Sequence, residues 1–108
     1  MTRGAIVVMA ARSAYTSKPR PAVVVQANAF NFAHPSVTVC PITSECADAP
    51  FFRVTLPPGD RTGLSTVSQV MVDKIVSIPR DAIGRQIGIC DPVYVDAIDE
   101  ALRVWLAL

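Results

Sequence analysis

The stretch Lys18–Gln26, which reads Lys-Pro-Arg-Pro-Ala-Val-Val-Val-Gln, decides the fold that this sequence predicts. Pro19 and Pro21 enclose Arg20. Because proline fixes φ and lacks a backbone N–H, we expect the arginine in a stiff, extended lead-in rather than in a helix. Val23–Val25 is a continuous β-branched run, which is typical of a strand buried on both faces. The sequence therefore predicts a long cation held at the lip of a core strand, and the alternative is an ordinary surface arginine at a proline-rich strand start.

Outward from this stretch, short apolar runs predict further strands. Pro41 comes late in one of these runs and predicts an edge strand or a bulge, because proline cannot donate to a strand ladder. A turn or a single helical turn is expected at Pro79–Gly84. The predicted strands are Ala5–Ala10, Ser36–Thr43, Phe51–Leu56, Leu64–Val70, Val72–Ile78 and Arg85–Cys90.

Two polar loops are expected between the first three strands. Arg12–Ser17 is a polar segment with one aromatic residue, Tyr15. Asn28–Pro35 contains turn-forming asparagines and ends in proline. We expect Phe30 and Phe32 to anchor this second loop on the core.

The C-terminal segment predicts an α-helix. Asp91 is a good N-cap, and Pro92 fits the first helical position, where its missing N–H would be unpaired anyway. We interpret Trp105 as a core or dimer contact rather than a platform for a ligand. Apolar residues recur at helical spacing and predict one buried stripe, made of Tyr94, Ile98, Ala101, Leu102, Trp105 and Leu108.

Six or seven short strands followed by one helix predict a mainly β fold with a C-terminal α-helix, a small and strongly bent antiparallel barrel. The length of 108 residues, with 51% hydrophobic and 18% charged residues, indicates a single globular domain over residues 1–108. No apolar run reaches the roughly 20 residues that a membrane span needs, so no membrane partner is expected. We interpret the apolar run Ala5–Ala11 as a first strand and not as a signal peptide.

The three cysteines, Cys40, Cys46 and Cys90, are odd in number and lack CxxC spacing. This pattern predicts no disulfide framework and fits a reducing cytoplasm. With His34 as the only histidine, a zinc site is not expected either.

Charge is unevenly distributed along the chain, although the net charge is only +1. Residues 1–44 carry four basic and no acidic side chains, whereas the remaining residues carry six basic and nine acidic ones. A positive field over the first half suits a phosphate-bearing ligand such as a nucleic acid. The alternative is that strand-rich segments simply contain few acids.

The chemistry available in this sequence is limited. A glycine-rich phosphate loop, a GxSxG motif and a second histidine are absent, and the carboxylates offer little support for a glycosidase pair. Arg20, Thr43 and Ser44 remain. A guanidinium binds phosphate bidentately and stabilises the charge of a pentacoordinate transition state, and a hydroxyl donates to another phosphate oxygen. With RNA, the substrate's own 2′-OH is the nucleophile. The alternative for Thr43 and Ser44 is capping of backbone groups at a strand end.

Several motifs, in one order and spacing, resemble the MazF/PemK (Kid) toxins of type II toxin–antitoxin systems. The resemblance extends over about residues 2–108. The motifs are Arg3-Gly4, Lys18–Gln26, Asn31, Cys40–Ser44, Gly63-Leu64, Ser68–Val70 and Asp73–Ile75.

This resemblance implies an SH3-like barrel homodimer of the MazF/PemK/CcdB type. It implies a metal-independent, cofactor-free endoribonuclease of the mRNA interferase type. Such toxins cleave single-stranded RNA at short sequences and leave 2′,3′-cyclic phosphate and 5′-hydroxyl ends. A cognate antitoxin holds them inactive, with its C-terminal segment in the RNA groove.

The resemblance also implies roles for individual residues. The family's catalytic arginine corresponds to Arg20, and its catalytic hydroxyl corresponds to Thr43. Tyr15 or Phe30 is expected to stack on a base, as aromatic residues do in single-strand RNA sites, and core packing is the alternative for Phe30. The residues expected to contact RNA are Tyr15, Ser17, Lys18, Ser44, Ser68 and Gln69.

Three departures from the family pattern leave the general base open. Gly4-Ala5 replaces a common Gly-Asp, the loop Arg12–Ser17 lacks a glutamate, and Ser68 stands where some members have an acid. Ser17, Lys18 and Ser68 are the positions to test.

Two other readings of the same barrel remain open, and the missing loop glutamate supports the second of them. One is a non-catalytic inhibitor of a protein target such as DNA gyrase, similar to CcdB, with a binding surface around Trp105. The other is a decayed member that retains only antitoxin binding.

Overall fold

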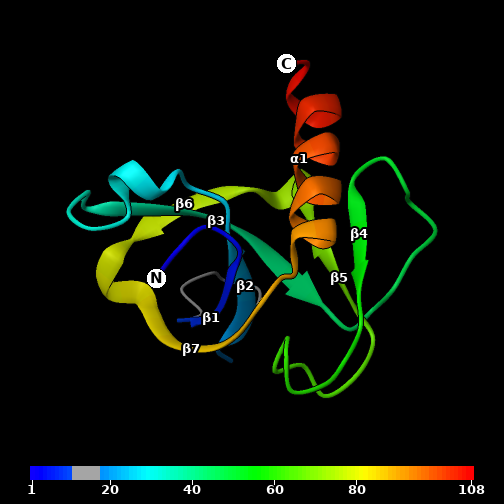
Figure 1. Ribbon diagram of the computed structural model, residues 1–108, viewed down its shortest axis with the longest axis horizontal. Coiled ribbons are helices and arrows are strands. Elements are labelled where there is room, and N and C mark those ends of the chain that lie inside the picture. The colour runs from blue at the N-terminus through cyan, green and yellow to red at the C-terminus, as the bar shows by residue number, and fades with distance from the viewer. Residues whose placement is uncertain (11–17) are drawn as a thin grey trace.

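The structure is a computed structural model that describes residues 1–10 and 18–108 (Figure 1). Within these residues, three short 3₁₀ helices, η1 (Asn28–Phe30), η2 (Val72–Lys74) and η3 (Arg80–Ala82), connect strands. The strands are β1 (Ala5–Met9), β2 (Arg20–Val24), β3 (Ser36–Thr43), β4 (Arg53–Leu56), β5 (Ser68–Met71), β6 (Val76–Pro79) and β7 (Ile83–Ile89), and the C-terminal helix is α1 (Pro92–Leu106). The predicted mainly β fold with one C-terminal helix is confirmed.

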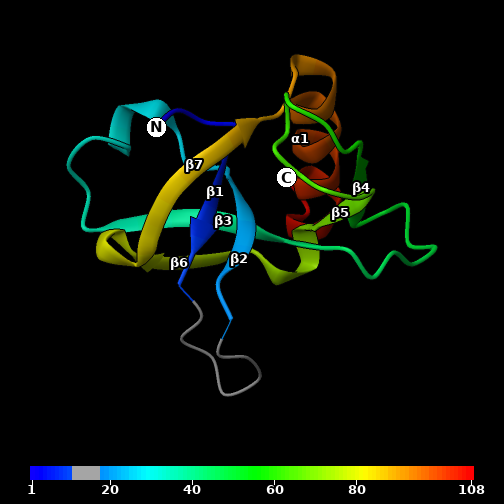
Figure 2. The ribbon, with the colours of Figure 1, turned by 90° about the horizontal axis from the view of Figure 1, so that it is seen from below.

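The long strand β3 organises the antiparallel sheet, whose order is β4-β5-β3-β2-β1-β7 with β6 also paired to β3. On one side, Val39–Pro41 of β3 pairs with Ala22–Val24 of β2. On the other side, Ser36–Val39 pairs with β6 and Ile42–Thr43 pairs with β5. β3 therefore changes partner in its middle, and the sheet bends there (Figures 1 and 2).

Pro41 lies at this change of partner. The expectation of an edge strand is wrong, because β3 is paired on both sides. On one side of β3 the pairing with β6 stops at Val39, opposite Val76, and the pairing with β5 starts at Ile42, opposite Val70. The missing N–H of proline is tolerated next to such an interruption in the ladder.

The central strands are buried on both faces, as the continuous apolar runs predict. Val23 and its neighbours on β1 and β3 face a core that α1 covers, together with Leu56, Val70 and Ile98. Val24 and the alternate residues face a second, smaller core. Val25 is only partly buried and follows the end of β2. The second core contains Ala5, Val7, Ala22, Val24, Val37 and Val39.

Helix α1 begins at Pro92 as predicted, but Asp91 makes no side-chain cap. Its carboxylate instead accepts a hydrogen bond from Arg61 Nε at 2.7 Å, which ties the helix to the turn after β4. Because α1 extends beyond the sheet at its C-terminal end (Figure 1), only the first part of the predicted apolar stripe is buried. Trp105 is 48% exposed and contacts Phe52 at a ring-centroid distance of 5.8 Å.

Some predicted elements are wrong in detail. Phe30 and Phe32 are 58% and 93% exposed, so they do not anchor their loop. Asn31 does so instead: it is buried, and its Nδ2 donates to the carbonyl of Gln26 at 3.1 Å. The run Leu64–Val70 forms a strand only from Ser68 onward, and Val72–Ile78 begins with the 3₁₀ helix η2. The predicted turn at Pro79–Gly84 contains η3.

None of the helices in the described part of the chain is long and apolar enough to cross a bilayer.

Because the thiols of Cys40 and Cys90 are buried, we expect the protein to be less stable at high pH. Burial raises the pKa of Cys40 from 9.0 to about 12 and that of Cys90 from 9.0 to about 11. As the pH rises above 9, the unfolded chain releases these protons while the folded chain retains them. The free energy of unfolding is therefore unaffected by the two thiols well below pH 9. It decreases as the pH rises through 9 toward their pKa values in the folded chain. We expect the free energy of unfolding in urea to fall by about 2 kcal/mol from pH 8 to pH 10. Equal values at both pH values would contradict this.

Candidate active site

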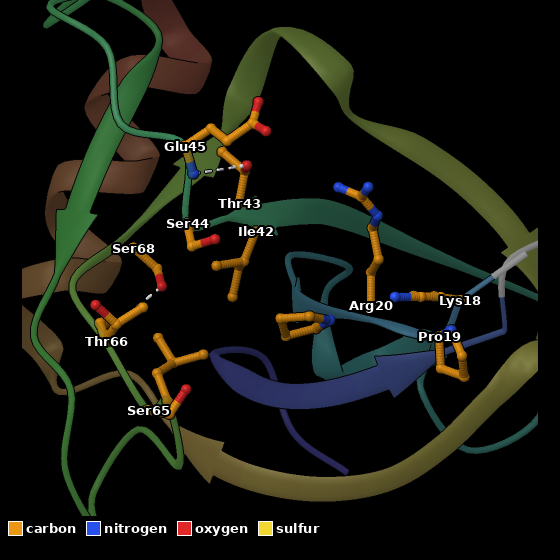
Figure 3. Close-up of a pocket in the computed structure, with 12 residues that line it drawn as sticks. Lys18, Pro19, Arg20, Ile42, Thr43, Ser44, Glu45, Ser65, Thr66 and Ser68 are labelled. Carbon is orange, nitrogen blue, oxygen red and sulfur yellow. Dashed lines mark hydrogen bonds between the residues drawn. The ribbon is translucent and has the colours of Figure 1, made fainter. Parts of the chain in front are cut away.

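A cavity of about 370 Å³ opens beside the start of β2 and the end of β3 (Figure 3). Three segments line it: Lys18–Pro21, Ile42–Glu45 and residues of the stretch Leu64–Ser68. The first segment contributes cations, and the other two contribute mostly hydroxyls. The sequence-predicted residues Lys18, Arg20, Thr43, Ser44 and Ser68 therefore meet at one place.

Arg20 is the first residue of β2, so it belongs to the strand rather than to a lead-in before it. Its side chain is exposed at the cavity and has no hydrogen-bond or ion-pair partner within the described part of the chain. β2 pairs with β3 so that Ala22 faces Pro41. The pairing of β2 with β3 ends there. Arg20 at the start of β2 and Thr43 at the end of β3 each lie two residues beyond this last pair, and both line the cavity.

Thr43 ends β3 and is partly buried. Its Oγ1 accepts a hydrogen bond from the backbone N–H of Glu45 at 3.1 Å, so it caps the strand end, as the alternative interpretation expects. Accepting this bond leaves the hydroxyl proton available to a ligand, because a hydroxyl is both donor and acceptor. The cap therefore fixes the orientation of the hydroxyl without occupying its donor.

The other predicted RNA contacts differ in their surroundings. Ser44 is exposed at the cavity, whereas Ser68 is 4% exposed and its Oγ donates to the carbonyl of Thr66 at 3.0 Å. Lys18 lines the cavity and also interacts with the protein. Tyr15 and Ser17 lie outside the described residues, as does the expected loop that contains them.

Gln69 does not line the cavity, and its side chain holds a loop. It is 7% exposed, and its Oε1 accepts from the N–H of Ala47 at 2.9 Å and from Arg53 Nη1 at 3.1 Å. Its Nε2 donates to the carbonyl of Ala47 at 3.0 Å. Because successive residues of a strand point to opposite faces, Gln69 points away when Ser68 points to the cavity.

Sequence reasoning missed Glu45, Ser65 and Thr66, which also line the cavity. The sequence contains a signal for Glu45, because this residue directly follows Thr43 and Ser44. Ser65 and Thr66 belong to a run that was interpreted as strand. Among the described residues, no three histidine, cysteine or acidic side chains are grouped closely enough to hold a metal ion.

Comparisons with known proteins agree with this architecture. A family model described as the PemK-like, MazF-like toxin of type II toxin–antitoxin systems matches residues 2–106. A protein of Mycolicibacterium smegmatis named probable endoribonuclease MazF is 43% identical over 108 residues, covering 100% of this chain and 98% of the relative.

Two solved structures have the same fold. Toxin MazF-mt6 of Mycobacterium tuberculosis is 26% identical with a TM-score of 0.82, covering 96% of this chain and 97% of the other. A mycobacterial endoribonuclease in complex with its cognate antitoxin is 24% identical with a TM-score of 0.83, covering 100% of this chain and 96% of the other. The fold is therefore that of the MazF toxins, and the family match over nearly the whole sequence shows that the chain belongs to the PemK-like, MazF-like toxins of type II toxin–antitoxin systems.

Proposed function

We propose that the endoribonuclease activity of this MazF-type toxin resides in the cavity between β2 and β3 and acts on single-stranded RNA. The observation that carries the proposal is that Arg20 of β2 and Thr43 of the adjacent strand β3 line one cavity, with the guanidinium unpartnered in the described part of the chain. An unpartnered arginine beside oriented hydroxyls is suited to a phosphodiester, because its fork of donors matches two phosphate oxygens.

The proposed reaction is an internal transesterification. The RNA 2′-oxygen attacks the adjacent phosphorus and loses its proton, a 2′-O–P bond forms, and the P–O5′ bond breaks. The leaving oxygen takes up a proton, so the products are a 2′,3′-cyclic phosphate and a 5′-hydroxyl. Arg20 stabilises the additional negative charge of the pentacoordinate phosphorane, and the Thr43 hydroxyl donates to a second oxygen. Lys18 and Ser44 hold the neighbouring backbone. No metal ion is required for these steps.

We further propose that a cognate antitoxin binds over the same cavity and that the toxin is a cytoplasmic homodimer. The solved mycobacterial relative with its cognate antitoxin supports such a partner.

Compartment and oligomeric state have separate support. Three free cysteines, Cys40, Cys46 and Cys90, suit a reducing compartment such as the cytoplasm. Exposed apolar side chains at the end of α1, including Trp105 and Leu108, support a subunit contact. Light scattering of the purified toxin, with a mass of two chains expected against 11.6 kDa for one, tests the dimer.

The decisive experiment is incubation of the purified toxin with a long single-stranded RNA in excess EDTA, followed by mapping of the new ends. We expect discrete cleavage with cyclic phosphate and 5′-hydroxyl ends, and a defined short sequence at each cut. Intact RNA under these conditions, or cleavage that EDTA abolishes, would overturn the proposal. A gyrase assay would then test the reading as a CcdB-like inhibitor.

A further inference from the structure

The described lining of the cavity contains one carboxylate, that of Glu45. The transesterification needs a group that accepts the 2′-OH proton. The hydroxyls of Thr43, Ser44 and Ser68 are poor proton acceptors at neutral pH, and Lys18 and Arg20 are cations. A carboxylate is therefore the lining group whose chemistry suits proton removal.

The backbone of Glu45 is held at both ends. Its N–H donates to Thr43 Oγ1 at 3.1 Å, and its carbonyl accepts from Arg53 Nη1 at 3.0 Å. Two residues on, the N–H and the carbonyl of Ala47 both bind the side-chain amide of Gln69. This loop after β3 is thus attached to β4 and β5. Such anchoring fixes the backbone from which the Glu45 side chain extends before substrate binds.

Figure 3 shows the Glu45 side chain at the rim of the cavity beside the Thr43 hydroxyl. Glu45 follows the end of β3 by two residues, and Arg20 begins the neighbouring strand β2, so both lie at strand ends that border the cavity. Three groups with different tasks, a phosphate-binding cation, a hydroxyl donor and a proton acceptor, thereby border the same space.

We propose that Glu45 is the general base of the cleavage reaction, an inference that rests on the proposed function. The carboxylate takes the proton of the 2′-OH as the 2′-O–P bond forms and the P–O5′ bond breaks. The departing 5′-oxygen receives its proton from water, and Glu45 later returns the acquired proton to solvent. The charge on the RNA is unchanged, since one phosphodiester replaces another.

The first test compares Glu45→Gln with Asp48→Asn, a matched loss of one exposed carboxylate in the same loop but outside the cavity. Single-turnover cleavage is measured on an RNA with one mapped site. Binding is measured with the same RNA carrying a 2′-deoxy nucleotide at that site. We expect Glu45→Gln to cleave at least about 100-fold more slowly with the Kd within about threefold, and Asp48→Asn to resemble the parent. Cleavage by Glu45→Gln at the parent rate would overturn the proposal.

The second test distinguishes a base from a structural residue. Glu45→Ala should lose cleavage, and added formate, a small carboxylate, should restore part of it in a concentration-dependent manner. Formate should not accelerate the parent or Arg20→Ala. If Glu45→Ala loses cleavage and formate does not restore it, Glu45 acts by positioning other groups of the site. This result would overturn its role as the general base. If the parent itself leaves RNA intact, the proposed function fails as well, whereas an active parent with an active Glu45→Gln refutes only the base.

Discussion

Arg20→Ala is expected to lower the rate of RNA cleavage by about 1000-fold while leaving the fold intact. In the proposed mechanism the variant lacks the donor that neutralises charge developing on the phosphorane, and loss of one such preorganised donor typically costs two to three orders of magnitude in rate. The side chain is exposed and makes no described contact by hydrogen bond or ion pair, so the free energy of unfolding should change by less than about 0.5 kcal/mol. Single-turnover cleavage and urea unfolding measure the two effects separately.

Two further variants show whether the effect of Arg20→Ala depends on the guanidinium group and on its place in the cavity. Arg20→Lys keeps the positive charge but loses the planar fork, and we expect it to recover only a small part of the rate. Arg85→Ala removes an exposed arginine from β7 that does not line the cavity, and its cleavage should match the parent. A fully active Arg20→Ala would eliminate Arg20 as a catalytic residue.

Gly88→Ala is expected to destabilise the protein by about 3 kcal/mol or more. A Cβ built at Gly88 would lie 2.1 Å from the carbonyl oxygen of Thr62 and 2.7 Å from that of Arg61. The obstructing atoms are backbone, so a rotamer change cannot relieve the contact, and either β7 or the turn after β4 must move. Urea unfolding of the purified variant gives the change in free energy.

Gly59→Ala is the matched control, because Gly59 has a positive φ of 131° but open space around its Cβ position. It should show only the smaller cost of a strained backbone, about 1 kcal/mol. Gly63→Ala combines both effects, since its φ is 71° and its Cβ would lie 2.1 Å from the carbonyl oxygen of Ile87. Equal stabilities for Gly88→Ala and Gly59→Ala would show that the close approach of the two segments is not important.

Sequence patterns predicted most of the fold because burial on two faces leaves a clear signature. The Val23–Val25 run and the proline at the start of α1 corresponded to real elements. The patterns are wrong where apolar residues are exposed, because the spacing of apolar residues does not show which part of a loop or helix the rest of the fold covers. Phe32 is in a loop whose anchor is Asn31, and Leu108 lies beyond the end of the sheet that covers the first part of α1.

The site was predicted less completely than the fold. The motifs point to Arg20 and Thr43, but their meeting at one cavity depends on the pairing of β2 with β3, which segments distant in the sequence determine. The resemblance, through its Ser68–Val70 motif, predicts that Gln69 contacts RNA. In the structure Gln69 lies outside the cavity lining, and its bonds to Ala47 hold a loop. Glu45 was overlooked because the carboxylate was sought only at positions typical of the family.

Placing both proposed catalytic side chains at the ends of two paired strands has an evolutionary consequence. The spacing between Arg20 and Thr43 depends on the register of β2 with β3, and a slip by one residue would transfer buried valines to the wrong face. The exposed residues 65–67 beside the cavity carry no such constraint, whereas the loop that holds Glu45 is fixed by its bonds to Arg53 and Gln69. Under the proposed mechanism, descendants of this toxin can therefore acquire new target sequences through drift at residues 65–67, while the catalytic groups are retained.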